Sequence, residues 1–284
     1  MKEVIIGGVP EHFNLPWSLS INNGEYVAEN IDLKWRDFPG GTGAMCKALR
    51  AKEIDIAVIL TEGIIKDIID GNPSKIVQTF IQTPLIWGIH VAANSQYKTI
   101  NDLKGTKAAI SRYGSGSHLM TYINAENNQW DLKNDLDFKI IDNLDGAIIG
   151  LQSGFADYFL WERFTTKPLV DNGTFRHIGN CPTPWPCFVI AVRNEFIESN
   201  KAELKTILNI INRTTSEFKD IPCIDKTIAY TYNQKIEDVR EWLNLTEWSQ
   251  KLIDKTTILK TQQELFSLNI IPEIVDYKTL TEKL

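Results

Sequence analysis

The sequence has no long hydrophobic run and no surplus of basic residues. Its longest apolar stretches have the length of β-strands, well short of the roughly 20 residues that a membrane-spanning helix needs. Across 284 residues, 36 Asp and Glu outnumber 30 Lys and Arg, which leaves a net charge of −6 without any block of like charges. Because nucleic-acid binding needs a basic surface, we exclude nucleic-acid partners, and we also expect no insertion into a membrane.

Cysteine is scarce as well, and Cys46, Cys181, Cys187 and Cys223 form no CxxC pair and no zinc-binding spacing with histidine. We therefore expect no metal and no cofactor. Cys181 and Cys187 are close enough in sequence for a disulfide, although free thiols are favoured because no secretion signal is visible. The first residues carry no signal-peptide pattern. This predicts a cytoplasmic location for a complete chain, or a periplasmic or extracellular one if a signal was removed.

Strand-like and helical segments alternate along the chain, which predicts an α/β fold with largely parallel sheets. From about residue 195 the pattern becomes helical, and the spacing of Leu204, Ile207, Leu208 and Ile211 indicates one buried helix face. The expected strands cover 3–9, 31–38, 54–60, 74–81, 85–93, 107–111, 136–142, 156–161, 175–180 and 186–193.

Two segments echo each other, namely 48–62 and 150–162. Each has a helix end, a short turn, an aspartate, an apolar strand and then a glutamate. Two similar α/β lobes would produce such a repeat, although αβ units also resemble one another by chance.

Two glycine-rich segments, 39–44 (PGGTGA) and 113–118 (YGSGSH), lie between an expected strand and a helix. A helix N-terminus offers free N–H donors and a partial positive charge, so it suits an anionic or hydrogen-bond-accepting ligand. Neither segment matches a nucleotide motif. Ordinary capped turns are the alternative, but two such loops at corresponding places favour ligand binding. The candidate residues of these loops are Gly41, Thr42, Arg112, Ser115, Gly116 and Ser117.

Aromatic side chains gather at expected strand ends and loops. They are Phe13, Trp17, Trp87, Trp161 and Trp185. Such rings pack well around flat or apolar ligands while an indole keeps one polar group. Packing between lobes is the alternative interpretation.

Glu62 and Glu162 each follow an apolar strand directly, and Thr61 precedes the first of them. The two carboxyls are suited to holding an amine or a ring N–H, or to acting as an acid/base pair. Alternatively, each caps a helix or pairs with a lysine or with Arg112. His12 is a candidate hydrogen-bond donor to a ligand, or a surface loop residue.

Segments 7–26, 37–64 and 100–120 together resemble the substrate-binding proteins of nitrate, sulfonate and taurine ABC importers, a group that includes NMT1/THI5-like proteins. The similarity covers about residues 4–200, and its most specific piece is DLKGTKAAIS, 102–111. The resemblance implies a type II periplasmic-binding-protein fold, in which two lobes close on a ligand like a Venus flytrap. The expected lobes are 1–87 with 190–284, and 88–189, with two crossover segments.

The resemblance further implies a monomeric solute-binding protein that holds a small anionic or aromatic/heterocyclic ligand, such as a sulfonate or a thiamine-precursor pyrimidine. Its partner would be an ABC transporter permease. The ligand contacts that it implies by position are His12, Phe13, Gly41, Thr42, Thr61, Glu62, Trp87, Ser115, Gly116, Ser117, Trp161, Glu162 and Trp185; we add Trp17 and Arg112 from the residues themselves.

An enzyme of thiamine or pyrimidine precursor metabolism on the same scaffold is the alternative. The pyrimidine-synthase branch of the group has a lysine after the third strand and a run of cysteines in the returning segment. Here the third strand ends in ILTEG, 59–63, and only Cys181 and Cys187 are present. We therefore favour binding over catalysis and assign no catalytic residue.

Overall fold

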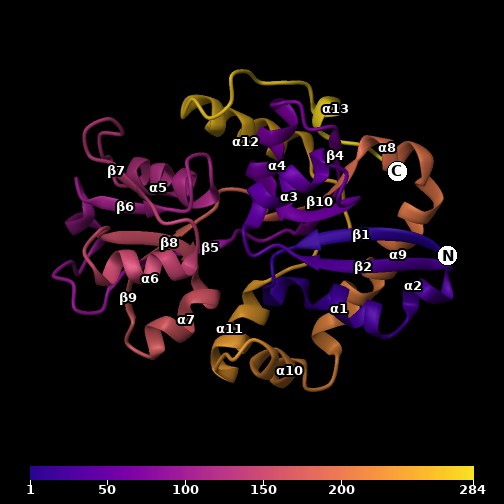
Figure 1. The fold of residues 1–284 in the computed structure, drawn as a ribbon, viewed down its shortest axis with the longest axis horizontal. Coiled ribbons are helices and arrows are strands. Elements are labelled where there is room, and N and C mark those ends of the chain that lie inside the picture. Colours follow the sequence, from indigo (N-terminus) through magenta and orange to yellow (C-terminus); the bar gives the residue numbers. More distant parts are fainter. The chain divides into compact units, whose positions relative to one another are not determined.

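The computed structural model describes all 284 residues, and the chain divides into two compact units (Figure 1). Unit 1 comprises Met1–Thr83 and Trp185–Leu284, and unit 2 comprises Pro84–Pro184. Each unit contains one five-stranded sheet flanked by helices. None of the helices has the length and apolar character that a membrane span requires.

The sheet of unit 1 has the order β2-β1-β3-β10-β4. Strand β1 runs parallel to β2 and β3, whereas β10 is antiparallel to β3 and β4. Strand β3 is apolar throughout and its first four residues are fully buried, as expected for a central strand covered on both faces. The strands are β1 (Lys2–Gly8), β2 (Ile31–Asp37), β3 (Ile56–Leu60), β4 (Ser74–Ile81) and β10 (Phe188–Arg193).

Helices cover both faces of this sheet, with α3 and α4 on one side and α1 and α9 on the other (Figure 1). The predicted apolar face of α9 is buried, and Leu204, Ile207 and Ile211 are wholly inaccessible to solvent. The helices of unit 1 are α1 (Leu15–Asn22), α2 (Glu25–Ala28), α3 (Gly41–Arg50), α4 (Thr61–Ile69), α8 (Asn194–Ser199), α9 (Lys201–Glu217), α10 (Ile224–Thr231), α11 (Ile236–Leu245), α12 (Lys255–Ser267) and α13 (Tyr277–Leu280), with 3-10 turns η1 (His12–Asn14) and η3 (Phe218–Asp220).

The sheet of unit 2 has the order β7-β6-β8-β5-β9, with β6 parallel to β7 and β8, and β5 antiparallel to β8 and β9. Its strands are β5 (Ile86–Ala92), β6 (Lys107–Ile110), β7 (Asp137–Ile140), β8 (Tyr158–Glu162) and β9 (Phe175–Pro182). Its helices are α5 (Gly116–Asn127), α6 (Leu144–Gln152) and α7 (Arg163–Asp171), with a 3-10 turn η2 (Ile100–Leu103).

The two sheets share one strand arrangement. In each, a strand (β1 or β6) pairs in parallel with two others (β2 and β3, or β7 and β8), and an antiparallel strand (β10 or β5) lies between one of these and the edge strand (β4 or β9). The antiparallel strand comes last along the chain in unit 1 and first in unit 2. The predicted α/β fold with two similarly built halves is thus confirmed. The echo between 48–62 and 150–162 corresponds to the units α3–β3–α4 and α6–β8–α7.

Helix α7 has no counterpart among the expected elements. Pro168 lies inside it, and proline is unfavourable in a helix interior because it removes a hydrogen bond and crowds the preceding turn. Phe164 and Thr166 are its buried residues. Burial of this short face against β5, β8 and β9 outweighs the local preference.

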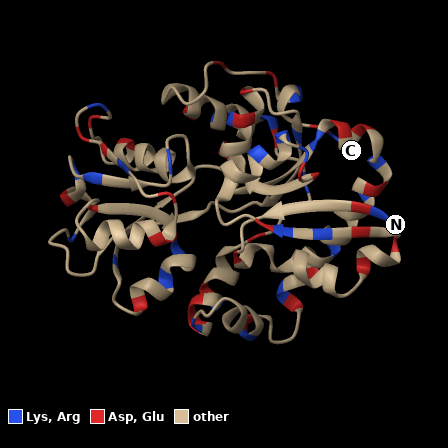
Figure 2. Ribbon diagram, in the orientation of Figure 1, with Lys and Arg blue, Asp and Glu red and all other residues tan.

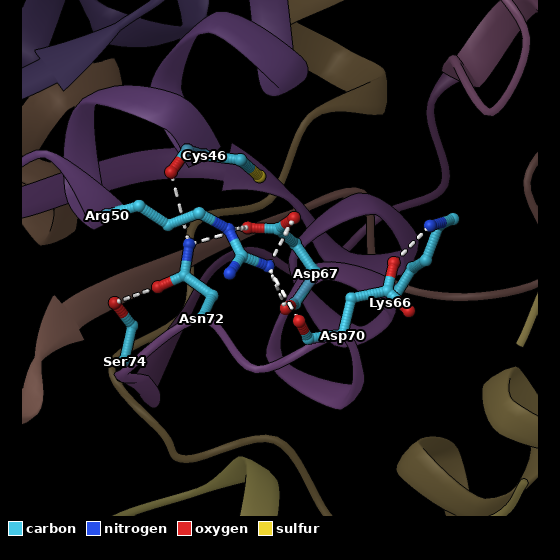
Figure 3. A network of polar contacts seen from close by, with 7 residues as sticks. All are labelled: Cys46, Arg50, Lys66, Asp67, Asp70, Asn72 and Ser74. Carbon is cyan, nitrogen blue, oxygen red and sulfur yellow. Dashed lines mark hydrogen bonds and ion pairs between the residues drawn. The ribbon is translucent and has the colours of Figure 1, made fainter.

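Acidic and basic residues are interspersed along the ribbon of both units (Figure 2). One polar network joins α3, α4 and β4 (Figure 3). Arg50 donates to both carboxylate oxygens of Asp67, and Asn72 donates to Asp67 and to the carbonyl of Cys46. Ser74 in turn donates to Asn72. Burial works against ionisation of Asp67, but the hydrogen bonds from Arg50 and Asn72 outweigh it and hold the pKa of Asp67 below its ordinary value.

Candidate functional site

In unit 1, the chain leaves β1 through η1 and leaves β3 directly into α4, so both segments lie at the carboxyl edge of the sheet. Thr61 is the first residue of α4, and two hydrogen bonds fix it. Its hydroxyl donates to the carbonyl of Pro186 at 2.5 Å, and its N–H donates to the carbonyl of Cys187 at 3.0 Å. The segment before β10 is thereby held against the start of α4.

Glu62 follows in the first turn of α4 and is only 3% exposed. Its Oε2 accepts a 2.8 Å hydrogen bond from the indole N–H of Trp185, whereas its Oε1 is buried without a hydrogen-bond partner. Burial raises the pKa of Glu62 to about 7, and the hydrogen bonds from its own backbone and from Trp185 oppose this only in part. Glu62 is thus a buried carboxyl that titrates near neutral pH.

His12 lies in η1 and is 1% exposed. Its ring stacks on Phe13 with centroids 4.8 Å apart and meets Trp242 of α11 edge-on at 4.3 Å. Burial lowers the pKa of His12 to about 3, so the imidazole is neutral, and its Nε2 has no hydrogen-bond partner. Phe13 in turn contacts Phe188 of β10 at 5.3 Å between centroids.

These aromatic residues share an edge with Glu62. Phe188 is paired in register with Leu60, the last residue of β3 and two positions before Glu62. Trp242 belongs to a helix far along the chain, and sequence analysis did not place it here. Tyr232 also contacts His12, with centroids 5.8 Å apart.

The glycine-rich segment at the start of α3 lies at the same edge of the unit 1 sheet as Glu62. Gly41 adopts a positive φ of 64°, which favours glycine, and the N-cap residue Gly40 provides no side-chain cap. Thr42 packs on Gly63, because a Cβ at Gly63 would come within 2.3 Å of Thr42 Cγ2. The predicted residues Thr42 and Glu62 thus lie on neighbouring parts of one edge. Trp17, by contrast, is wholly buried between Tyr26 and Phe80 in the core of unit 1.

In unit 2, the segment 111–118 links β6 to α5 and bonds largely to itself. Ser115 is the N-cap of α5 and accepts from the N–H of His118. Ser117 Oγ accepts from the N–H of Ser111 and lies 3.0 Å from Ser115 Oγ. Gly114, at a φ of 75°, donates its N–H to Nδ1 of His118. The loop therefore leaves fewer N–H groups for a ligand than its glycine content suggested.

The other predicted members of this loop are placed at its ends. Gly116 is the first residue of α5, and Arg112 is half-buried in the turn before it. Tyr113 is 63% exposed and meets His118 edge-on.

Glu162 ends β8 and is 4% exposed. Its Oε2 accepts from the N–H of Thr165 at 2.6 Å and so caps α7. Burial raises the pKa of Glu162 to about 7, against the hydrogen bonds from the start of α7 and the charge of Arg163. Trp87 of β5 is paired in register with Glu162, and its indole N–H is buried without a partner. Trp161 is half-buried and lies opposite Gly88.

Glu62 and Glu162 therefore occupy matching positions in their units. Each stands where the third strand of its sheet passes into a helix, each is buried, and each has its pKa raised to about 7. The repeat in the sequence was the signal that located them. None of the four cysteines forms a disulfide, and no group of three or more His, Cys, Asp or Glu is placed to hold a metal ion.

Comparison with known proteins agrees with this architecture. The family described as Ca3427-like PBP matches residues 87–181. No curated protein matches the sequence.

Several solved structures have the same fold over the full chain. A Candida albicans protein, the CA3427 gene product, is 24% identical and has a TM-score of 0.90, with 100% of this chain and 97% of that chain covered. The alkanesulfonate-binding protein SsuA from Xanthomonas axonopodis pv. citri, bound to MOPS, is 15% identical with a TM-score of 0.84 and coverage of 100% and 99%. The periplasmic aliphatic sulphonate-binding protein SsuA from Escherichia coli is 18% identical with a TM-score of 0.77 and coverage of 100% and 94%. The chain thus has the periplasmic-binding-protein fold, as the sequence resemblance implied.

Proposed function

We propose that this chain is a solute-binding protein and that its two units together hold one small ligand through the carboxyl edges of their sheets. The observation that carries the proposal is the matched pair of buried carboxyls, Glu62 and Glu162. A buried ionisable group whose pKa is shifted strongly by burial is costly and is characteristic of functional sites. Finding one at the same topological position in each unit, where α/β folds bind ligands, supports a binding role.

The ligand class follows in outline from the neighbours and the side chains. Two structural neighbours are sulfonate-binding proteins, which supports a sulfonate. The aromatic residues His12, Phe13 and Trp87 support a flat or heterocyclic body, such as the thiamine-precursor pyrimidine that a likeness to NMT1/THI5-like proteins implies. Closure of the units around the ligand is part of the proposal, because binding shifts a protein toward the state that holds its ligand best.

An ABC transporter permease is the macromolecular partner that we propose, in keeping with the import systems of the structural neighbours. A periplasmic or extracellular location goes with that role, since the E. coli neighbour is periplasmic. A monomer is sufficient for this function. We do not propose catalysis, because the segment ILTEG, 59–63, at the end of the third strand lacks the lysine that the resemblance to pyrimidine synthases would require there.

A thermal-shift panel tests the proposal with purified protein and three sets of compounds, namely sulfonates that include MOPS and taurine, nitrogen bases, and carboxylates. A ligand at about 100 times its Kd should add about 2.7 kcal/mol to the free energy of unfolding. Trp161→Ala and Ser115→Ala should each reduce the affinity for any ligand found. Asp254→Ala removes a comparable N-cap, at the start of α12, and should leave affinity unchanged. A panel in which no compound raises the melting temperature would contradict the proposal.

A further inference from the structure

The environment of Glu62 contains hydrogen-bond donors but no positive charge. The indole of Trp185 and the backbone of Glu62 itself donate to its carboxyl, and no charged side chain acts on it. Thr42 of α3, which packs on the next residue, is neutral. On the remaining side, the carbonyls of Pro186 and Cys187 are already bonded to Thr61.

These donors favour the ionised form of Glu62, and so does its place in the first turn of α4, where the helix dipole stabilises negative charge. Burial alone opposes ionisation. A buried carboxylate is stable when a cation or further donors complete its coordination. Oε1 has neither, although Oε2 is engaged by Trp185. Oε1 can therefore accept a further hydrogen bond.

We propose that Glu62 selects the ligand, and that Oε1 accepts an N–H from a nitrogen base such as an amine, an amidine or an aminated heterocycle. This inference rests on the proposed function and narrows it, because an anionic ligand would meet an uncompensated carboxylate. The neutral His12 supplies a second unsatisfied polar atom, Nε2, on the same edge. Glu162 is less suited to this selection, because its Oε2 already caps α7 and Arg163 lies beside it.

Glu62→Gln reverses one hydrogen-bonding group while it preserves the shape of the side chain. The amide oxygen still accepts from Trp185, and the amide NH₂ takes the place of Oε1. A ligand N–H then faces a donor instead of an acceptor. The matched control is Glu237→Gln, at the second residue of α11, where the side chain is exposed.

Isothermal titration at about pH 8 with benzamidine, 4-aminopyridine, benzoate and benzenesulfonate provides the test. We expect at least one of the two bases to bind the wild type more tightly than either anion. Glu62→Gln should reduce the affinity for that base by about tenfold or more, since a hydrogen bond to a charged group contributes roughly 1.5–3 kcal/mol. Glu237→Gln should not change it. Affinity for the base should also fall between about pH 8 and pH 6, as Glu62 becomes protonated.

Three results would overturn the inference. If benzenesulfonate or benzoate binds best, and does so at least as tightly to Glu62→Gln, solute binding stands but selection by Glu62 does not. If a base binds with equal affinity to the wild type and to Glu62→Gln, Glu62 does not contact it. If neither these four compounds nor any member of the thermal-shift panel binds, the proposed function fails and this inference fails with it.

Discussion

The indole N–H of Trp185 donates a 2.8 Å hydrogen bond to Oε2 of Glu62, and so joins the segment before β10 to the first turn of α4. Trp185 is 4% exposed, so the bond is formed away from water. In this setting a hydrogen bond to an ionised group is strong, whereas loss of the donor leaves a buried carboxylate less satisfied. Trp185 therefore favours the ionised form of Glu62, against the larger effect of burial, as well as contributing an aromatic surface.

Trp185→Phe tests this control. The substitution removes the N–H but keeps most of the ring, so the pKa of Glu62 should rise further above 7. The free energy of unfolding of the variant should be lower than that of the wild type by about 1.5–3 kcal/mol at about pH 8. The difference should be smaller at about pH 5, where Glu62 is protonated. Chemical denaturation at both pH values measures the difference. Trp242→Phe is the control, because the indole N–H of Trp242 has no partner to lose. An equal, pH-independent loss in both variants would contradict the assignment.

The raised pKa of Glu62 also predicts how stability depends on pH. The folded state holds the Glu62 proton up to about pH 7, whereas the unfolded chain releases it near 4.5. The contribution of this group to the free energy of unfolding is therefore fully present below the unfolded pKa, and it is lost as pH rises through the folded pKa. A shift from 4.5 to about 7 corresponds to on the order of 3 kcal/mol.

Glu162 has the same shift and the same sign. Burial lowers the pKa of His12, His90 and His118, and these groups act in the opposite direction, so the effect of the two carboxyls is measured as a difference between variants. Between about pH 8 and about pH 5, Glu62→Gln should gain less free energy of unfolding than the wild type, or lose more, and the double variant with Glu162→Gln should show a larger difference. Calorimetry at both pH values measures this difference, and variants with the same pH dependence as the wild type would contradict the raised pKa values.

The Arg50–Asp67 pair yields a prediction of opposite sign. Arg50→Ala removes two hydrogen bonds to the partly buried carboxylate of Asp67. Because the Arg50 side chain is itself exposed to solvent, we expect the free energy of unfolding to fall by about 1 kcal/mol at neutral pH. Because the pKa of Asp67 is lowered in the folded protein, the loss should shrink as pH falls through that pKa. Lys66→Ala is the control. Its ion pair with Asp70 lies on the surface of α4 and contributes roughly 0.5 kcal/mol or less. A loss from Arg50→Ala no larger than that from Lys66→Ala would refute the role given to this network.

The strands and the two-sheet plan were predictable because apolar runs of strand length and their spacing are local properties of the chain. The repeat also located Glu62 and Glu162, since both follow the same strand-to-helix pattern. The serine at position 115 similarly has the side chain expected of an N-cap.

The contacts of these residues were less accessible to sequence analysis. The hydrogen bond from Trp185 to Glu62 spans 123 positions of the sequence. Similarly, the ring contact between His12 and Trp242 is formed by two segments that only tertiary packing brings together. Helix α7 was missed because packing prevailed over the local signal of Pro168. Local pattern thus located the candidate site residues, whereas their charge state and partners depended on the fold.

The contact between Thr42 and Gly63 leads to a prediction about the same edge of unit 1. Gly63→Ala places a methyl group within 2.3 Å of Thr42 Cγ2, so we expect overpacking to lower the free energy of unfolding by about 1–3 kcal/mol. Thr42→Ser deletes that Cγ2 and makes room. Gly63 lies inside α4, where alanine is favoured over glycine by roughly 1 kcal/mol, so in the Thr42→Ser background the same Gly63→Ala change should become neutral or stabilising.

A double-mutant cycle measured by urea denaturation gives the coupling energy between the two positions directly. Gly71→Ala serves as a comparison, because this glycine has a positive φ of 88° and nothing near its Cβ position, so its cost should be the same in both backgrounds. If Gly63→Ala has the same effect with Thr42 and with Ser at that position, the two segments do not touch as described. Because Thr42 and Glu62 would then no longer be neighbours, the edge of unit 1 proposed for ligand binding would lose the contribution of α3.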